Sequence, residues 1–85
     1  MRHIDFTPVA EAQFNEWAVT DKKIYNKIID LLEAVRLEPF TGIRKPEPLK
    51  YQFKGYWSRR INKAHRLVYK VTDESVIVIS CMFHY

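Results

Sequence analysis

The apolar residues of this chain change their spacing near residue 39, and this change constrains the fold more than any other feature. Between residues 8 and 38 they recur every three to four positions, which indicates two amphipathic helices. From residue 49 onward apolar and polar residues alternate, which indicates strands. The strands are expected at residues 2–6, 49–53, 56–61, 65–71 and 76–83. The sequence therefore predicts an α+β fold, with two N-terminal helices packed on a mainly antiparallel, twisted sheet.

Local signals set the boundaries of the helices. Thr7 and Pro8 supply an N-cap and a proline at the first helical position, so the first helix is expected to begin there. Thr20-Asp21 can cap the second helix. This helix is expected to end before Pro39, because a residue that precedes proline is disfavoured in the helical conformation.

Two segments of the second half have distinct compositions. Residues 39–48 hold three of the four prolines and Gly42, which predicts an ordered surface loop of a kind that often carries a site. Residues 76–79 are apolar on both faces, so this strand is expected to be central. The helices would cover one of its faces, and other protein or a ligand would cover the other.

Length and composition indicate one globular domain over residues 1–85. A chain of 85 residues has enough apolar surface for one core only. Cys81 is the only cysteine, so no internal disulfide can form, as in proteins of a reducing compartment. No apolar run is long enough to cross a membrane and the first residues do not resemble a signal peptide, so a cytoplasmic protein is expected.

Positive charge is concentrated in one segment of the chain. Residues 44–70 contain nine lysines and arginines and one acid, Glu47. Tyrosines, Phe53 and Trp57 lie between these charges, a pattern that suits a phosphate backbone with bases that can stack. A solvated charged face over core aromatics fits the same composition equally well.

A tight turn at residues 62–64 would place two arginines opposite each other. If Ile61 pairs with His65, Arg60 stands across from Arg66 on one face of the sheet. Opposed like charges cost stability, but a phosphate between them would turn the pair into a clamp, because guanidinium groups match phosphate oxygens. We therefore interpret Arg60 and Arg66 as anion ligands.

Cleavage of RNA without a metal needs a base for the ribose 2′-hydroxyl, cations for the phosphate and an acid for the departing 5′-oxygen. Glu47 is the candidate base, and a surface salt bridge is its structural alternative. His84 is the candidate acid, because histidine titrates near neutral pH, and a solvated terminal histidine is its alternative. His65 is expected in the core or at its rim. A metal site is not expected, because His84, Cys81 and Glu47 lack a recognised ligand spacing.

Four blocks of sequence, taken in order, resemble the YoeB toxins of the RelE superfamily. They are residues 45–50 (KPEPLK), 55–61 (GYWSRRI), 65–69 (HRLVY) and 84–85 (HY). The resemblance covers nearly the whole chain, and residues 20–22 also fit it. It implies a RelE-like fold and a bacterial toxin that cuts messenger RNA on the ribosome. It also implies that a YefM-like antitoxin holds the toxin inactive.

The resemblance further implies roles for single residues. Glu47 would be the general base, Arg66 would stabilise the phosphorane-like transition state, and His84 would be the general acid. The residues expected to bind phosphate or base are Lys50, Arg60 and Tyr85, with Arg59 added from the basic segment. The products would be a 2′,3′-cyclic phosphate, able to open to a 3′-phosphate, and a fragment with a 5′-hydroxyl. No cofactor is expected.

Three positions depart from the family's pattern. Arg44 stands where glycine is common, Tyr51 where histidine is found, and Met82 where arginine is frequent. These changes bear on affinity and ribosome docking, and they leave the expected catalytic residues unchanged.

Two other functions fit parts of the sequence. A ParE-like relative would share the fold and poison a topoisomerase through protein contacts, with no need for Glu47, Arg66 and His84 together. A non-catalytic RNA-binding module would use the basic segment and the tyrosines alone. Replacing His84 with alanine distinguishes these two functions from a ribonuclease, because only the ribonuclease would lose its activity in the variant.

The expected partners are messenger RNA, the ribosome, an antitoxin and a second copy of the chain. The antitoxin is expected to be a disordered acidic segment that folds onto the basic face. A homodimer would form through Trp17 or Tyr25, if the helices expose them. A regular last strand would send His84 and Tyr85 to opposite faces, so the end of the chain is expected to bend if both serve one site.

Overall fold

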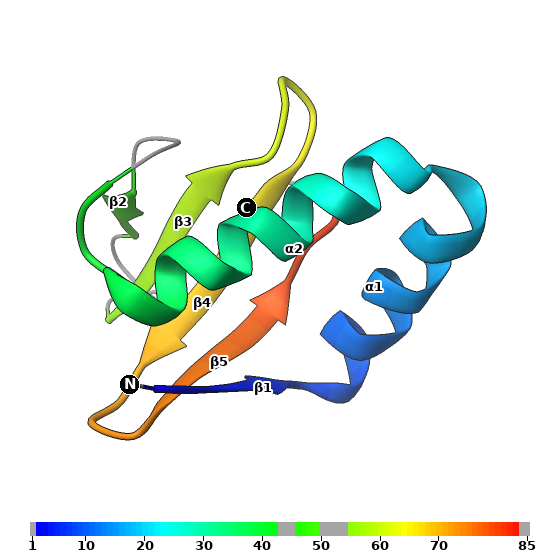
Figure 1. The fold of residues 1–85 in the computed structure, drawn as a ribbon. Helices are drawn as coiled ribbons and strands as arrows, with labels where there is room; N and C mark the ends of the chain where they lie inside the picture. The colour runs from blue at the N-terminus through cyan, green and yellow to red at the C-terminus, as the bar shows by residue number, and fades with distance from the viewer. Residues whose placement is uncertain (1, 43–45, 50–54, 84–85) are drawn as a thin grey trace.

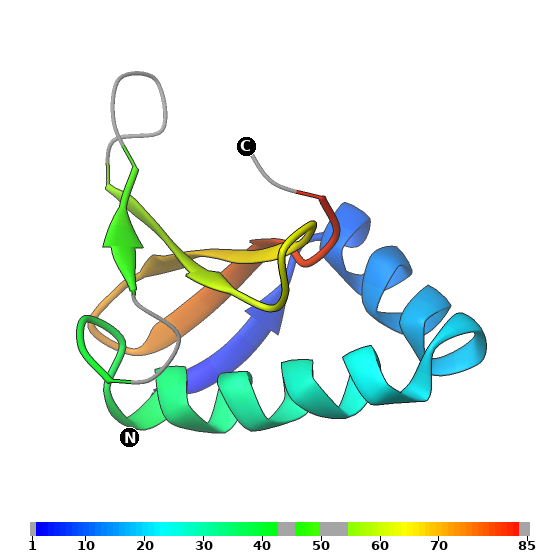
Figure 2. The same cartoon turned by 90° about the horizontal axis from the view of Figure 1, so that it is seen from above.

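The helices and the sheet form two layers. The computed structural model describes residues 2–42, 46–49 and 55–83. Its elements, in chain order, are β1 (His3–Phe6), α1 (Pro8–Thr20), α2 (Lys22–Leu37), β2 (Glu47–Pro48), β3 (Tyr56–Arg60), β4 (Arg66–Val71) and β5 (Ser75–Ser80). Helix α2 runs along one face of the sheet, and α1 packs beside it against β5 and β1 (Figure 1 and Figure 2).

The described residues form a five-stranded sheet in the order β1-β5-β4-β3-β2. Only β1 and β5 pair in parallel, and the other neighbours are antiparallel. The mainly antiparallel α+β fold is therefore confirmed. So is the central position of the last strand, because β5 lies between β1 and β4.

The helices begin and end where the sequence predicts. Thr7 precedes α1, and its hydroxyl accepts a hydrogen bond from the Ala10 amide at 3.2 Å. Asp21 caps α2 through its carboxylate, which accepts from the amides of Lys23 and Ile24 at 3.1 and 3.3 Å. Helix α2 ends at Leu37, two residues before the proline. No helix within the described residues is both long and apolar enough to cross a membrane.

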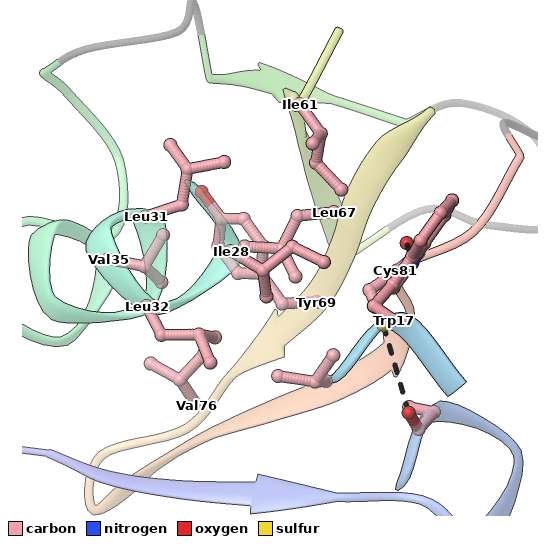
Figure 3. Close-up of a cluster of buried hydrophobic side chains, with 12 residues drawn as sticks. Trp17, Ile28, Leu31, Leu32, Val35, Ile61, Leu67, Tyr69, Val76 and Cys81 are labelled. Atoms are coloured by element: carbon pink, nitrogen blue, oxygen red, sulfur yellow. Dashed lines mark hydrogen bonds between the residues drawn. The ribbon is translucent and has the colours of Figure 1, made fainter. Parts of the chain in front are cut away.

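The core lies between α2 and the sheet (Figure 3). Helix α2 contributes a buried stripe made of Ile28, Leu31, Leu32 and Val35. The strands contribute buried residues that alternate with those of the opposite face, among them Leu67, Tyr69, Val76 and Val78. Burial of such side chains contributes about 25 cal/mol per Å² of apolar surface, so this layer stabilises the packing of α2 on the sheet.

The last strand is shorter than predicted. It ends at Ser80 instead of residue 83, because side chains of α1 take the backbone groups of Cys81 that a strand neighbour would otherwise use. The Cys81 amide donates to Gln13 Oε1 at 2.8 Å, and the Cys81 carbonyl accepts from Trp17 Nε1 at 2.9 Å. Phe83 then adopts a φ of 61°, so the chain bends at this residue instead of continuing as a regular strand.

Of the two dimer contacts expected on the helices, the structure overturns the one through Trp17. Trp17 is 8% exposed and belongs to the core, so it offers no surface to a second copy. Tyr25 is half-buried and stacks on Phe14, with 4.7 Å between ring centroids. Both rings stabilise the contact between helix and core.

Candidate functional site

The face of the sheet that points away from the helices brings the charged residues together. Asn62 closes the turn after β3, because its side-chain oxygen accepts from the amides of Ala64 and His65 at 2.9 and 2.8 Å. The Ile61 amide then donates to the His65 carbonyl at 2.9 Å, and Arg60 pairs directly with Arg66. The predicted opposition of these two arginines is confirmed.

Glu47 lies on the same face, next to Arg66. It pairs with Ser58 across β2 and β3, and Ser58 pairs with Val68 across β3 and β4. The Glu47 carboxylate is 4.0 Å from the Arg66 guanidinium, and the two side chains are 56% and 26% exposed. An ion pair so open to water contributes little to stability, so both groups remain available to a ligand.

The end of the described chain is attached beside Arg66. The Arg66 amide donates to the Phe83 carbonyl at 2.8 Å, and the Phe83 amide donates to His65 Nδ1 at 2.7 Å. His65 is half-buried between the rings of Trp17 and Phe83, which confirms its expected place at the rim of the core. Lys50, His84 and Tyr85 lie outside the described residues, as do Arg44 and Tyr51. Met82, the third departure, packs partly against the core.

Arg59 is not a ligand on this face. Its side chain is fully buried on the helix side of the sheet, where its guanidinium donates to Tyr69 Oη at 3.1 Å. It also donates to the carbonyls of Glu38 and Thr41, which follow α2. The expectation that Arg59 binds phosphate is therefore wrong, because a buried guanidinium held by these acceptors has no access to RNA.

Tyr69 completes this buried group of polar atoms. Its hydroxyl donates to the Pro39 carbonyl at 2.7 Å, so the tyrosine and Arg59 together fasten residues 38–41 to the sheet. Burial raises the pKa of the Tyr69 phenol, and the neighbouring Arg59 acts in the opposite direction. The segment held in this way leads to the loop that carries Glu47.

Ser58 is a polar residue of the site that the sequence did not single out. It is 1% exposed and shares the face of Glu47 and Arg66, and its hydroxyl has no hydrogen-bond partner in the part of the chain that the structure describes. Successive side chains of a strand point to opposite faces of the sheet. Because Trp57 and Arg59 share the face toward the helices, Ser58 between them must face away from the helices, and the sequence could have indicated this.

The donor chemistry of this face suits an anion. Arg60 and Arg66 offer guanidinium groups, and Glu47 is the acid beside them. Across the described ranges, His, Cys, Asp and Glu side chains form no group of three that could hold a metal ion. The arrangement can bind a phosphate between two arginines and take a proton from a group placed next to it.

Similarity to known proteins covers nearly the whole chain. Residues 6–85 match a family model described as the YoeB-like toxin of bacterial type II toxin-antitoxin systems. Toxin YoeB of Escherichia coli K12 is 52% identical over 69 residues, which are 81% of this chain and 82% of that protein. These values are well above what a shared fold alone requires.

Solved structures agree with the sequence comparison. A YoeB/ParE toxin from Agrobacterium tumefaciens superposes with a TM-score of 0.94 at 41% identity, over 98% of this chain and 99% of that one. Staphylococcus aureus YoeB was solved as a dimer, with a TM-score of 0.92 at 42% identity over 99% and 98% of the two chains. It was also solved in a YoeB-YefM complex, with a TM-score of 0.90 at 42% identity over 100% and 99%. This chain therefore belongs to the YoeB-like toxins of bacterial type II toxin-antitoxin systems.

Proposed function

We propose that this toxin is a metal-independent endoribonuclease that cuts messenger RNA on the ribosome. The observation that carries the proposal is the placement of Glu47 4.0 Å from Arg66, with Arg60 paired to Arg66 on the same face of the sheet. A carboxylate beside two opposed arginines supplies a proton acceptor and a phosphate clamp in one place. A merely structural role would not favour two like charges side by side.

The chemistry follows from the charges on this face. Glu47 takes the proton of a ribose 2′-hydroxyl, and the 2′-oxygen attacks the adjacent phosphorus. Arg66 and Arg60, with Lys50, stabilise the negative charge that builds up on the phosphate oxygens. The bond between phosphorus and the 5′-oxygen breaks, and His84 gives a proton to that oxygen. The products are a 2′,3′-cyclic phosphate and a 5′-hydroxyl.

The attachment of Phe83 supports the role of His84. Phe83 precedes His84 in the sequence, and its backbone is hydrogen-bonded to both His65 and Arg66. An acid that acts on the leaving group must come from a segment held near the phosphate clamp. Tyr85, which follows His84, is proposed to help position the phosphate or the base.

The partners are proposed on the same basis. The complex of the S. aureus relative with YefM supports a YefM-like antitoxin, and its dimer supports a homodimer of this chain. The dimer would use a surface other than Trp17, which is buried. Messenger RNA and the ribosome are the proposed targets, and the cytoplasm is the compartment that holds both.

The test uses the purified toxin, freed of antitoxin, with ribosomes programmed with a defined message. Both ends at each cut are mapped. We expect cleavage that leaves a 5′-hydroxyl, and we expect Glu47→Gln and His84→Ala each to slow it by about 10²- to 10⁴-fold, the usual contribution of general acid–base catalysis. Glu74→Gln is the matched control, because Glu74 is an exposed acid in the turn between β4 and β5.

Each alternative predicts a different result. A 5′-phosphate at the cut would contradict the mechanism, because it indicates attack by water instead of the 2′-hydroxyl. Binding of RNA that His84→Ala leaves intact, without any cleavage, would favour the non-catalytic RNA-binding module. Absence of both binding and cleavage, with inhibition of a topoisomerase, would favour the ParE-like activity.

A further inference from the structure

His65 connects three parts of the molecule that lie far apart in the sequence. Its ring meets the edge of the Trp17 ring of α1, with 4.8 Å between centroids at an interplanar angle of 80°. On the other side lies the Phe83 ring, with centroids 5.5 Å apart. Its Nδ1 accepts the Phe83 amide hydrogen at 2.7 Å, a short distance for a hydrogen bond between nitrogens.

This hydrogen bond fixes the chemical form of the imidazole. A backbone amide can only donate, so Nδ1 must carry its lone pair, and the ring proton must be on Nε2. His65 therefore serves as an acceptor here, which a doubly protonated ring cannot do.

The end of the chain is attached at two successive points. Gln13 and Trp17 hold the backbone of Cys81 from α1. His65 and the Arg66 amide hold the backbone of Phe83 from the start of β4. The positive φ of Phe83, which a phenylalanine rarely adopts, is maintained by these two hydrogen bonds on either side of its Cα.

The second attachment is adjacent to the candidate site. The Phe83 carbonyl that accepts from the Arg66 amide belongs to the peptide bond between Phe83 and His84. Arg66 is also the residue whose side chain lies beside Glu47. One residue of β4 therefore contacts both the candidate base and the peptide that precedes the candidate acid.

We propose that His65 is a positioning residue, which holds the Phe83 amide through Nδ1 and so fixes the peptide that precedes His84 at the Arg66 end of β4. The proposal rests on the proposed ribonuclease function. His65 itself does not touch the reacting atoms. Its effect is on the geometry of proton transfer to the leaving group, so it concerns the rate of the chemical step more than the binding of RNA.

Two variants of nearly equal size separate the hydrogen bond from the packing. His65→Asn keeps an acceptor, because the Asn side-chain oxygen can occupy the place of Nδ1. His65→Leu has the same shape as His65→Asn and no acceptor. We expect His65→Leu to lower the single-turnover cleavage rate on programmed ribosomes by about 10- to 100-fold with little change in KM, as a misplacement of about 1 Å would. We expect His65→Asn to stay within a few-fold of the unmodified toxin.

Amide hydrogen exchange at Phe83 measures the attachment without reference to activity. In the unmodified toxin and in His65→Asn this amide should exchange slowly, and in His65→Leu at least ten-fold faster, while amides in the middle of β4 stay unchanged in all three proteins. The nitrogen chemical shifts of the unmodified His65 ring should show Nδ1 without a proton.

The outcomes distinguish this proposal from the proposed function. A proton on Nδ1, or equal Phe83 exchange in the Leu and Asn variants, overturns the attachment by His65 whether or not RNA is cut. Faster Phe83 exchange with unchanged cleavage in His65→Leu overturns the positioning role and leaves the ribonuclease intact. Slow Phe83 exchange in an unmodified toxin that cuts no RNA contradicts the ribonuclease and supports the attachment.

Discussion

Arg59 and Arg60 follow each other in β3 and face opposite sides of the sheet. Arg59 is buried and fastens the segment after α2, whereas Arg60 is exposed and opposes Arg66. The sequence distinguishes the two arginines, because residues two positions apart in a strand share a face. Arg59 lies two positions from each of the apolar residues Trp57 and Ile61, so it belongs to the face toward the core. The positive charge of the whole segment obscured this signal and led to the incorrect assignment of Arg59 to the phosphate site.

The two arginines should therefore respond differently to the same substitution. Arg59→Met keeps the length of the side chain but leaves the carbonyls of Glu38 and Thr41 without this donor. It is expected to lower the free energy of unfolding by about 2–4 kcal/mol, as for other losses within buried polar networks. Arg60→Met should change this free energy by about 0.5 kcal/mol or less. Urea denaturation measures both, and an equal loss in the two variants would contradict the assignment.

The two helices and the strands β1, β3 and β4 were predictable, and the end of the chain was not. Residues 47–48 form β2 within the segment predicted as a loop, and the strand predicted at residues 49–53 lies, apart from Leu49, outside the described residues. The helix caps and the turn after β3 depend on residues within a few positions of each other, so their patterns can be read locally. The end of β5 depends on Gln13, whose side chain accepts from Cys81 across 68 positions of sequence. No local pattern reports such a contact, so the strand was predicted to continue to residue 83.

Helix α2 offers a test of the local signals. Asp21 caps it by accepting two backbone hydrogen bonds, and both are lost in Asp21→Ala. The variant is expected to be less stable by about 1 kcal/mol, whereas Asp21→Ser, which keeps an acceptor, should retain most of the stability. Thermal unfolding of the three proteins checks the expectation, and similar losses in both variants would indicate that the cap contributes through its charge.

At the scale of the whole molecule, two buried acidic groups, Cys81 and Tyr69, make the stability depend on pH in the alkaline range. Burial raises the pKa of the Cys81 thiol from 9.0 to about 12, and it also raises that of the Tyr69 phenol. The unfolded chain therefore releases these protons at lower pH than the folded chain does. The contribution of the Cys81 thiol to the free energy of unfolding is fully present below about pH 9, and it is lost as the pH rises toward 12.

Replacing Cys81 tests this linkage. Between pH 9 and about 12 the free energy of unfolding of the unmodified toxin should fall by up to about 1.4 kcal/mol more per pH unit than that of Cys81→Ala. The slopes are compared instead of the absolute values, because the substitution also removes buried volume at every pH. Urea titrations at several pH values give both slopes, and parallel slopes would show that the thiol does not titrate with unfolding.

The parallel pairing of β1 with β5 has a consequence for how the toxin is made. β1 leaves the ribosome before the other elements, yet the strand it pairs with, Ser75–Ser80, is synthesised after all of them. β5 also joins β1 to β4, so the layer that covers α2 stays incomplete until those residues have emerged. Contacts of such long sequence separation form slowly and late. Translation of the message and completion of the folded toxin are therefore separate events, because the sheet cannot close before β5 has been made.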